Sequence, residues 1–149
     1  MGKTVLVLDH HEAPYYSEDA LVVNNQLCDY PNKTLSGAGI VYKFCCYLDS
    51  ILDVNVAQDL VDLAALGIIA DVMDLRNYET KRILDLGFEN IKNPFIQKVI
   101  EDNQFLFKGV VSARSFAFYI APLINATIRM GTQEEKQILF WALLEHMAF

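Results

Sequence analysis

The sequence predicts an α/β protein in which a short parallel β-sheet precedes a mostly helical region. Residues 4–8 form a continuous apolar run rich in β-branched side chains, which is typical of a strand covered on both faces in a parallel sheet. Residues 21–23 form a second short apolar run that ends at two asparagines, and we interpret it as the next strand. From residue 36 onward, apolar residues recur at helical spacing instead.

The helices follow in an order that their start signals indicate. The stretch "DYPNKTLSGAG" has the composition of a loop, and Ser36 is placed to cap the helix behind it. A second amphipathic helix follows Asn55, and "GIIADVMDL" then predicts a turn or a short strand. Residues 94–107 open with a proline at a favoured first helical position, and residues 132–148 make the last helix. Residues 112–131 match neither the strand period nor the helical period.

The composition excludes some classes of function. The net charge of −7 argues against a surface that wraps nucleic acid by charge alone, because that mode of binding needs clustered Lys and Arg. No apolar run reaches the ~20 residues of a membrane span, so we expect no membrane association. The three cysteines are odd in number and two of them are adjacent, which predicts free thiols and a cytoplasmic protein.

Two histidines between two acids stand directly behind the first strand, in "VLVLDHHEA". Ligand sites in open α/β sheets form beyond the carboxyl ends of the strands, so the strand delivers Asp9, His10 and His11 to that edge. Imidazole nitrogen together with carboxylate oxygen suits Mn²⁺, iron or Zn²⁺. The alternative is a pair of ordinary surface or core histidines. Any further metal ligands must come from elsewhere in the chain.

Asp71 is the best candidate for a further ligand, because it follows the apolar residues of "GIIADVMDL". Burying an unpaired carboxylate is costly, and a metal ion or another cation is the usual remedy. The alternative is a local cap at the end of a helix. Three other acids are expected to face solvent: Asp59, Asp62 and Asp74.

The stretch "VLVLDHHEA" resembles the motif that names the DHH phosphoesterase superfamily. The rest of the chain resembles its RecJ branch, the single-strand-specific DNA exonucleases. Four blocks keep the order of that family: "LDHHEA", "VVNNQLCDYPNKTLSGAGIVYKF", "DLVDLAALGIIADVMDL" and "IAPLINATIRMG". The last block distinguishes the chain from the pyrophosphatases and small-oligonucleotide phosphodiesterases of the superfamily.

The resemblance implies a role for each residue of the strand end. His10 would be a metal ligand, and His11 would face the scissile phosphate or its leaving oxygen as a catalytic residue. Asp9 would orient this turn through hydrogen bonds. Asp71 would correspond to the final motif of the family, a carboxylate on the same metal.

The resemblance also implies substrate contacts. Ser36, Gly37 and Gly39 would open a helix whose backbone N–H groups approach a phosphate; a plain helix start is the alternative. Asn125 and Arg129 would face the cleft, with the arginine as a cation for a phosphate. An isoleucine precedes this arginine where the family usually has glycine, so the local backbone departs from the pattern.

The aspartate motifs of the family belong upstream of the DHH strand, and only three residues precede that strand here. The resemblance therefore implies a partial DHH-type catalytic domain with a remnant of the parallel sheet. Residues 1–131 would be the C-terminal part of this domain. Residues 132–149 would begin the connecting helix toward a missing C-terminal domain.

For the complete enzyme, the resemblance implies stepwise hydrolysis of single-stranded DNA from the 5′ end with two Mn²⁺ or Mg²⁺ ions. We expect this fragment or subunit to bind the metal weakly or not at all and to be inactive alone. One alternative is another phosphoesterase of the superfamily, acting on small oligonucleotides or pyrophosphate. The other is a non-catalytic remnant that serves as an interaction module.

The apolar surface predicts a partner. Residues 138–144, "ILFWALL", are apolar all the way round a helix, and such helices are normally buried. The edge of the strand at residues 4–8 would also lack its neighbour. We expect pairing with the missing N-terminal half or a homo-oligomer. The alternative is that the helix at 138–144 folds back onto the helices of its own domain.

Overall fold

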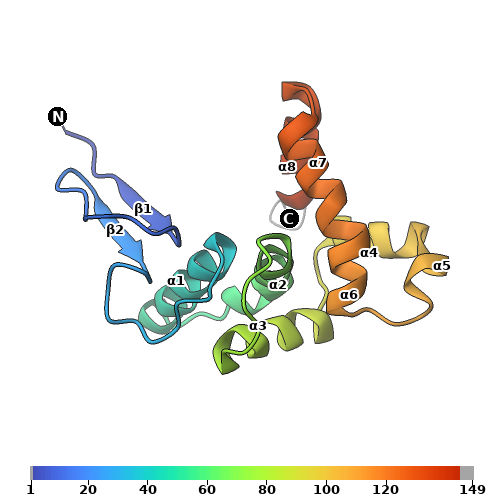
Figure 1. The fold of residues 1–149 in the computed structure, drawn as a ribbon, viewed down its shortest axis with the longest axis horizontal. Coiled ribbons are helices and arrows are strands. Elements are labelled where there is room, and N and C mark those ends of the chain that lie inside the picture. Colours follow the sequence, from blue (N-terminus) through green and yellow to red (C-terminus); the bar gives the residue numbers. More distant parts are fainter. Residues whose placement is uncertain (1, 145–149) are drawn as a thin grey trace.

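The computed structural model describes residues 2–144 and confirms the predicted fold class, with two parallel strands followed by helices (Figure 1). Strand β1 (Leu6–Asp9) pairs with β2 (Leu21–Asn24) in a register that sets Asp9 opposite Asn24. Both strands therefore end at the same edge of the sheet.

The expectation that the first strand is covered on both faces is wrong for the described residues. Val5, Leu6 and Val7 are between 37% and 49% exposed, and Leu21 is 63% exposed. The first helix, which begins after Ser36, packs against β1, and Leu8 contacts the core beneath the sheet. The sheet thus buries little apolar surface against the described residues.

Three helices form the middle of the molecule. Helix α1 (Gly37–Leu52) begins at Ser36 as predicted. The 3₁₀-helix η1 (Ala57–Leu60) leads into α2 (Val61–Ala70), and α3 (Tyr78–Glu89) follows after a turn. The stretch "GIIADVMDL" therefore contains the end of α2 and a turn, and no strand.

The later helices are more broken than the sequence predicts. The expected helix at 94–107 divides at Asn103, whose backbone leaves the helical conformation. The segment without a clear period is helical but contains a π-helix, which lengthens the repeat and removes the usual spacing of apolar residues. The elements are α4 (Pro94–Asp102), α5 (Gln104–Phe107), α6 (Ala113–Ser115), η2 (Phe116–Ile120), α7 (Ala121–Met130) and α8 (Gln133–Leu144). The last residues of the expected terminal helix, 145–149, lie outside the described residues.

Two apolar clusters hold these elements together. The first gathers side chains of α1, α2 and α3, among them Ile40, Ala65 and Ile83. The second gathers side chains of α4 to α8, with Phe116 at its centre. Leu66 belongs to the second cluster although it lies on α2. This helix therefore joins the two halves of the molecule, the first half up to α3 and the second half from α4 to α8.

Asp62 also joins the halves, and the expectation that it faces solvent is wrong. The residue is fully buried, and its carboxylate accepts hydrogen bonds from the N–H groups of Lys92 and Asn93 at 2.8 and 2.7 Å. The side chain on α2 thereby holds the segment that begins α4. Asp59 and Asp74 are partly exposed and form ion pairs with Lys92 and Arg76.

Helix α8 is buried on one side. Leu139 and Leu143 pack into the second cluster, whereas Ile138, Phe140 and Trp141 are between 55% and 61% exposed. The alternative prediction, that this helix folds back onto its own domain, is therefore confirmed for the face that carries Leu139 and Leu143. No helix among residues 2–144 is long and apolar enough to cross a membrane.

Candidate functional site

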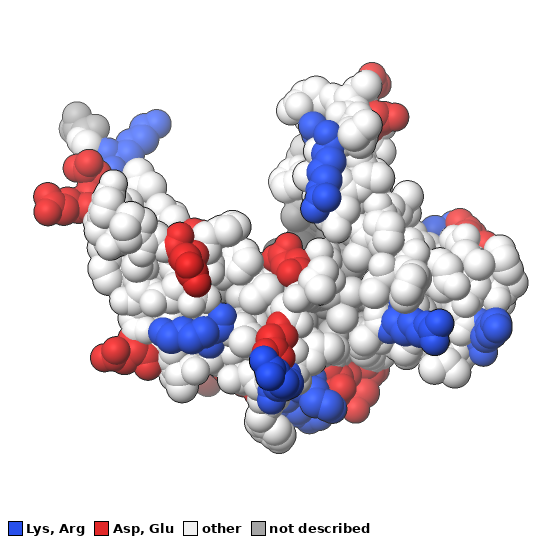
Figure 2. Space-filling view, in the orientation of Figure 1, with Lys and Arg blue, Asp and Glu red and all other residues white. Residues whose placement is uncertain are grey.

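Figure 2 shows a hollow between two arms of the molecule, one carrying the strands and the other carrying α7 and α8. Acidic side chains lie at the tip of β1 and over α2, and a basic side chain lies on the arm of α7 and α8. The residues that the sequence singled out lie on or beside β1, α1, α2 and α7.

The end of β1 gathers three potential metal ligands. Asp9, His10 and His11 each offer one ligand atom, and these atoms lie within 4.8 Å of one another. His11 Nδ1 lies 2.7 Å from Asp9 Oδ1, which fixes the ring and leaves Nε2 available. This hydrogen bond holds the pKa of Asp9 below its ordinary value, because it stabilises the ionised carboxylate.

Asn24 holds the backbone of this turn, and sequence reasoning assigned it no role. Its side-chain Nδ2 donates a hydrogen bond of 2.9 Å to the carbonyl oxygen of His11, and Asn24 itself is buried. The register places it opposite Asp9 at the end of the neighbouring strand. An asparagine that ends a second parallel strand is the signal that could have identified it.

His10 points toward the end of α2. Its Nε2 lies 3.8 Å from Asp71 Oδ2, although the two residues are far apart in the sequence. The His10 side chain is 16% exposed and packs at the start of α1, where a Cβ on Gly37 would lie 3.6 Å from the ring. The strand end, the beginning of α1 and the end of α2 thus meet at one place.

Gly67 permits this meeting. A Cβ at Gly67 would lie 2.5 Å from the Cβ of Ala38 and 3.2 Å from Ser36 Oγ, so only a glycine allows α2 to approach the start of α1 this closely. The short distance between these helix ends brings Asp71 within reach of His10.

The backbone directly behind Asp71 is strained. Val72 has a φ of 53°, a left-handed conformation that costs a β-branched residue roughly 1–2 kcal/mol. The N–H groups of Val72 and Met73 donate to the carbonyl groups of Ile69 and Ile68, so α2 ends in a Schellman-type cap where glycine is usual. Strain of this kind often gathers at functional sites, and here it directly follows Asp71.

The start of α1 uses its serine to cap the helix. The Ser36 hydroxyl accepts a hydrogen bond of 3.2 Å from the N–H of Gly39, and both residues are buried. Gly37 is half-buried and borders the His10 ring. Among these three predicted phosphate contacts, Gly37 is therefore the residue whose backbone faces the strand end.

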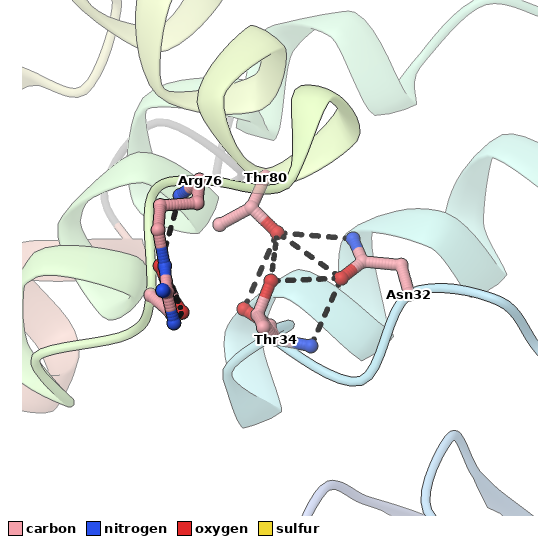
Figure 3. A network of polar contacts seen from close by, with 5 residues as sticks. Asn32, Thr34, Arg76 and Thr80 are labelled. Atoms are coloured by element: carbon pink, nitrogen blue, oxygen red, sulfur yellow. Dashed lines mark hydrogen bonds and ion pairs between the residues drawn. The ribbon is translucent and has the colours of Figure 1, made fainter.

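A buried polar network anchors the loop that leads into α1 (Figure 3). The Thr80 hydroxyl at the start of α3 lies within hydrogen-bond distance of Asn32 and Thr34. Asn32 also accepts from the Thr34 N–H, and both Asn32 and Thr80 are buried. The loop is tied to α3, and the loop in turn places Ser36 and Gly37.

Glu79 extends this network to α1. Its carboxylate accepts hydrogen bonds from Tyr30 and Asn32 and pairs with Lys43 at 2.8 Å. Burial opposes the ionised form, but the hydrogen bonds from Lys43, Tyr30 and Asn32 outweigh it, and the pKa of Glu79 is lowered. The same contact with Glu79 raises the pKa of Lys43.

Asn125 and Arg129 lie on α7 and line a pocket of about 450 Å³ with the last turn of α2 and the turn after it. Val72 and Met73 belong to the same lining, so the pocket borders the segment that carries Asp71. Arg129 is exposed, and no ion pair of this side chain occurs within residues 2–144.

The donor set fits a divalent cation. With bonds of about 2.1 Å, two ligand atoms on one ion lie at most about 4.2 Å apart. The 3.8 Å between His10 Nε2 and Asp71 Oδ2 meets this limit. Imidazole nitrogen and carboxylate oxygen suit Mn²⁺ among other transition metals.

The chain resembles known nucleases over most of its length. No protein-family model matches the chain. A putative single-strand DNA-specific exonuclease, YorK, from the SPbeta prophage of Bacillus subtilis is 46% identical over 96% of the chain. RecJ of the same bacterium is 31% identical over 87% of the chain, and RecJ of Thermus thermophilus is 30% identical over 90%.

A crystal structure of exonuclease RecJ bound to manganese superposes with a TM-score of 0.70 and 27% identity over 97% of the chain. This chain is a RecJ-like segment of the DHH superfamily. It spans 25% of the length of YorK, 16% of the Bacillus RecJ and 39% of the RecJ chain in that crystal structure.

In this RecJ-like segment, the predicted residues divide into those that meet and those that stand apart. Asp9, His10, His11 and Asp71 meet at the strand end. Asn125 and Arg129 stand across the hollow, beside the turn behind Asp71. Their roles toward metal and substrate stay predictions.

Proposed function

We propose that the chain forms the DHH-containing part of a metal-dependent exonuclease that removes nucleotides from the 5′ end of single-stranded DNA. The observation that carries this proposal is the approach of His10 Nε2 to Asp71 Oδ2 beside the Asp9–His11 pair. The likeness to YorK and RecJ supports the substrate class. In this proposal residues 1–131 belong to the catalytic domain, and residues 132–149 begin a connecting helix.

His10 and Asp71 would hold a divalent cation, Mn²⁺ or Mg²⁺. When bound, such an ion supplies Lewis-acid polarisation of the scissile phosphate and lowers the pKa of neighbouring water. Asp9 keeps the His11 ring oriented through Nδ1, and Nε2 would then face the leaving oxygen or the phosphate. Arg129 would supply positive charge to a phosphate of the strand.

We expect the 149-residue chain to bind Mn²⁺ weakly, because His10 and Asp71, even with His11, leave most coordination positions to water. Calorimetry should give a low-affinity isotherm that disappears in the His10→Ala variant. A tight stoichiometric Mn²⁺ site would contradict this expectation and would require further ligands from other acids of the chain.

By itself the 149-residue chain should not digest single-stranded DNA above background, because it supplies few of the carboxylates that a two-metal site needs. Release of nucleotide from a labelled oligonucleotide in Mn²⁺ measures this. Robust hydrolysis that is lost in His10→Ala would show instead that the site is complete by another route.

A chimera tests the proposed function directly. The segment of YorK that matches this chain is replaced by the chain, and a 5′-labelled and a 3′-labelled single strand are digested in parallel. We expect labelled mononucleotide to appear first from the 5′ label, and His11→Ala to slow it by about 100-fold or more. Asp85→Asn on the exposed face of α3 serves as the control. An inactive chimera beside active YorK would overturn the proposal.

A further inference from the structure

A second pocket lies at the end of the molecule opposite the strands, around α5, α6 and η2 (Figure 1). Its volume is about 450 Å³, and its lining combines aromatic rings with two cations. The residues that matter for its chemistry are Phe107, Lys108, Arg114, Phe118 and Tyr119. None of them belongs to the site at the end of β1.

The charge of this pocket is opposite to that of the chain. The protein carries a net charge of −7, yet the pocket is lined by Lys108 and Arg114 and by no acidic residue. Neither cation forms an ion pair within residues 2–144. Figure 2 shows basic side chains over this end of the molecule. An anionic ligand is the complement of such a surface.

The aromatic rings are exposed and held in place. Phe118 is 66% exposed, and the Arg114 guanidinium carbon lies 5.9 Å from the centre of its ring. Tyr119 is 37% exposed and packs against Phe107 with ring centres 5.7 Å apart. Both exposed rings lie on the π-helix η2, a distortion that is frequent at functional sites.

The backbone beside Arg114 is also fixed. Ser112 and Ser115 exchange hydrogen bonds in a capping box at the start of α6, which places Arg114 above the Phe118 ring. Exposed rings beside unpaired cations are the elements with which proteins bind single-stranded nucleic acid, since bases stack on the rings and phosphates contact the cations.

We propose that this pocket binds single-stranded nucleic acid, with a base stacked on Phe118 and backbone phosphates at Lys108 and Arg114. This proposal rests on the proposed function, which makes single-stranded DNA the substrate. It adds a second contact with that DNA, remote from the site of hydrolysis. An acidic peptide would match the cations, but it would leave the exposed face of Phe118 without a stacking partner.

Binding of a fluorescein-labelled oligothymidylate, followed by fluorescence anisotropy in EDTA at low salt, tests the pocket in the 149-residue chain. We expect Phe118→Ala to weaken binding by about fivefold or more, the lower limit for losing one base stack. Arg114→Gln should lower the slope of log affinity against log salt by about 0.7, the value for one phosphate contact on a single strand. Phe118→Tyr retains a ring and should retain binding.

Two variants serve as matched controls. Phe140→Ala removes a ring on α8 that is 55% exposed, and Lys81→Gln removes an exposed cation on α3. Circular dichroism checks that every variant is folded. Equal losses in the pocket and control variants, no binding by the parent chain, or full competition by an acidic peptide would each overturn the proposal. The binding assay contains EDTA and therefore measures no hydrolysis. An inactive YorK chimera would overturn the proposed function without deciding whether this pocket binds the oligonucleotide.

Discussion

Around the end of β1 polar side chains hold the backbone, whereas α4 to α8 are held mainly by apolar packing. Asn24, Asn32 and Thr80 are all buried, and each donates or accepts a hydrogen bond that ties a loop or turn in place. In the other half Ile96, Phe116 and Ile120 are fully buried in one apolar cluster. Hydrogen bonds have preferred directions and apolar contacts do not, so the first half is suited to orienting ligand atoms.

The difference extends to the exposed surface. Beside the predicted site Lys43 pairs with Glu79, while at the pocket of α5, α6 and η2 the cations Lys108 and Arg114 form no ion pair among the described residues. A metal-binding cluster needs fixed geometry, and a surface that follows a flexible strand needs exposed rings and available charge. The two halves meet at α2, and perturbations there should have the largest effects.

Asp62→Ala should be the most destabilising substitution. It leaves the buried N–H of Asn93 and the part-buried N–H of Lys92 without their acceptor, at roughly 1–3 kcal/mol for a buried group. We expect the free energy of unfolding in urea to fall by about 3 kcal/mol. Asp85→Ala on the exposed face of α3 should change it by less than ~0.5 kcal/mol. Equal effects of the two substitutions would mean that Asp62 does not join the halves.

Asp62 also shows what sequence patterns miss. A charged residue beside an apolar stripe has the pattern of a solvated face. The burial of Asp62 depends on N–H groups of Lys92 and Asn93, which lie 30 and 31 residues further along the chain. By contrast, the helix starts at Ser36 and Pro94 were predicted, because caps are short-range signals. The π-helix η2 was not predicted, because it shifts the spacing of apolar residues within one turn.

The candidate site divides in the same way. Asp9, His10 and His11 were predicted together because they are adjacent and follow one strand. The approach of Asp71 depends on a close crossing at Gly67, which no pattern of spacing reveals. The end of the second strand pointed to Asn24, but its place opposite Asp9 required the register of the two strands.

Gly67→Ala should separate α1 from α2. The new Cβ would lie 2.5 Å from that of Ala38, and overpacking of this kind costs about 1–3 kcal/mol, reduced by the better helix propensity of alanine. We expect a net loss of about 1 kcal/mol in urea unfolding, and a further loss of Mn²⁺ affinity as His10 and Asp71 move apart. Combination with Ala38→Gly should restore both, as a double-mutant cycle measures. If the double variant recovers neither stability nor Mn²⁺ affinity, the two positions are not in contact.

The polar network should add a modest dependence of stability on pH. The folded pKa of Glu79 is lowered, so its contribution is present above the ordinary glutamate pKa and is lost as the pH falls through the folded value. Because 29% of the Glu79 side chain is exposed, solvent screens its contacts in part, and we expect less than about 1 kcal/mol. Urea unfolding at neutral and acidic pH, compared between the parent and Glu79→Gln, measures the difference. A parent and variant with parallel pH profiles would rule out this contribution.

The smallest effect on stability should come from the exposed face of α8, where Trp141 is 58% exposed. Leu139, the buried residue among those described in this helix, lies on the opposite face. Trp141→Gln removes no buried side chain, so the free energy of unfolding should change by no more than ~0.5 kcal/mol. If this face pairs with another copy of the chain, as the apolar run at 138–144 predicts, the substitution should shift the molar mass in light scattering toward 16.9 kDa. Leu139→Gln, which opens the second apolar cluster, is the matched contrast and should lower stability strongly. A parent chain that remains a 16.9 kDa monomer at every concentration would limit the role of α8 to its contacts with α4 and α7.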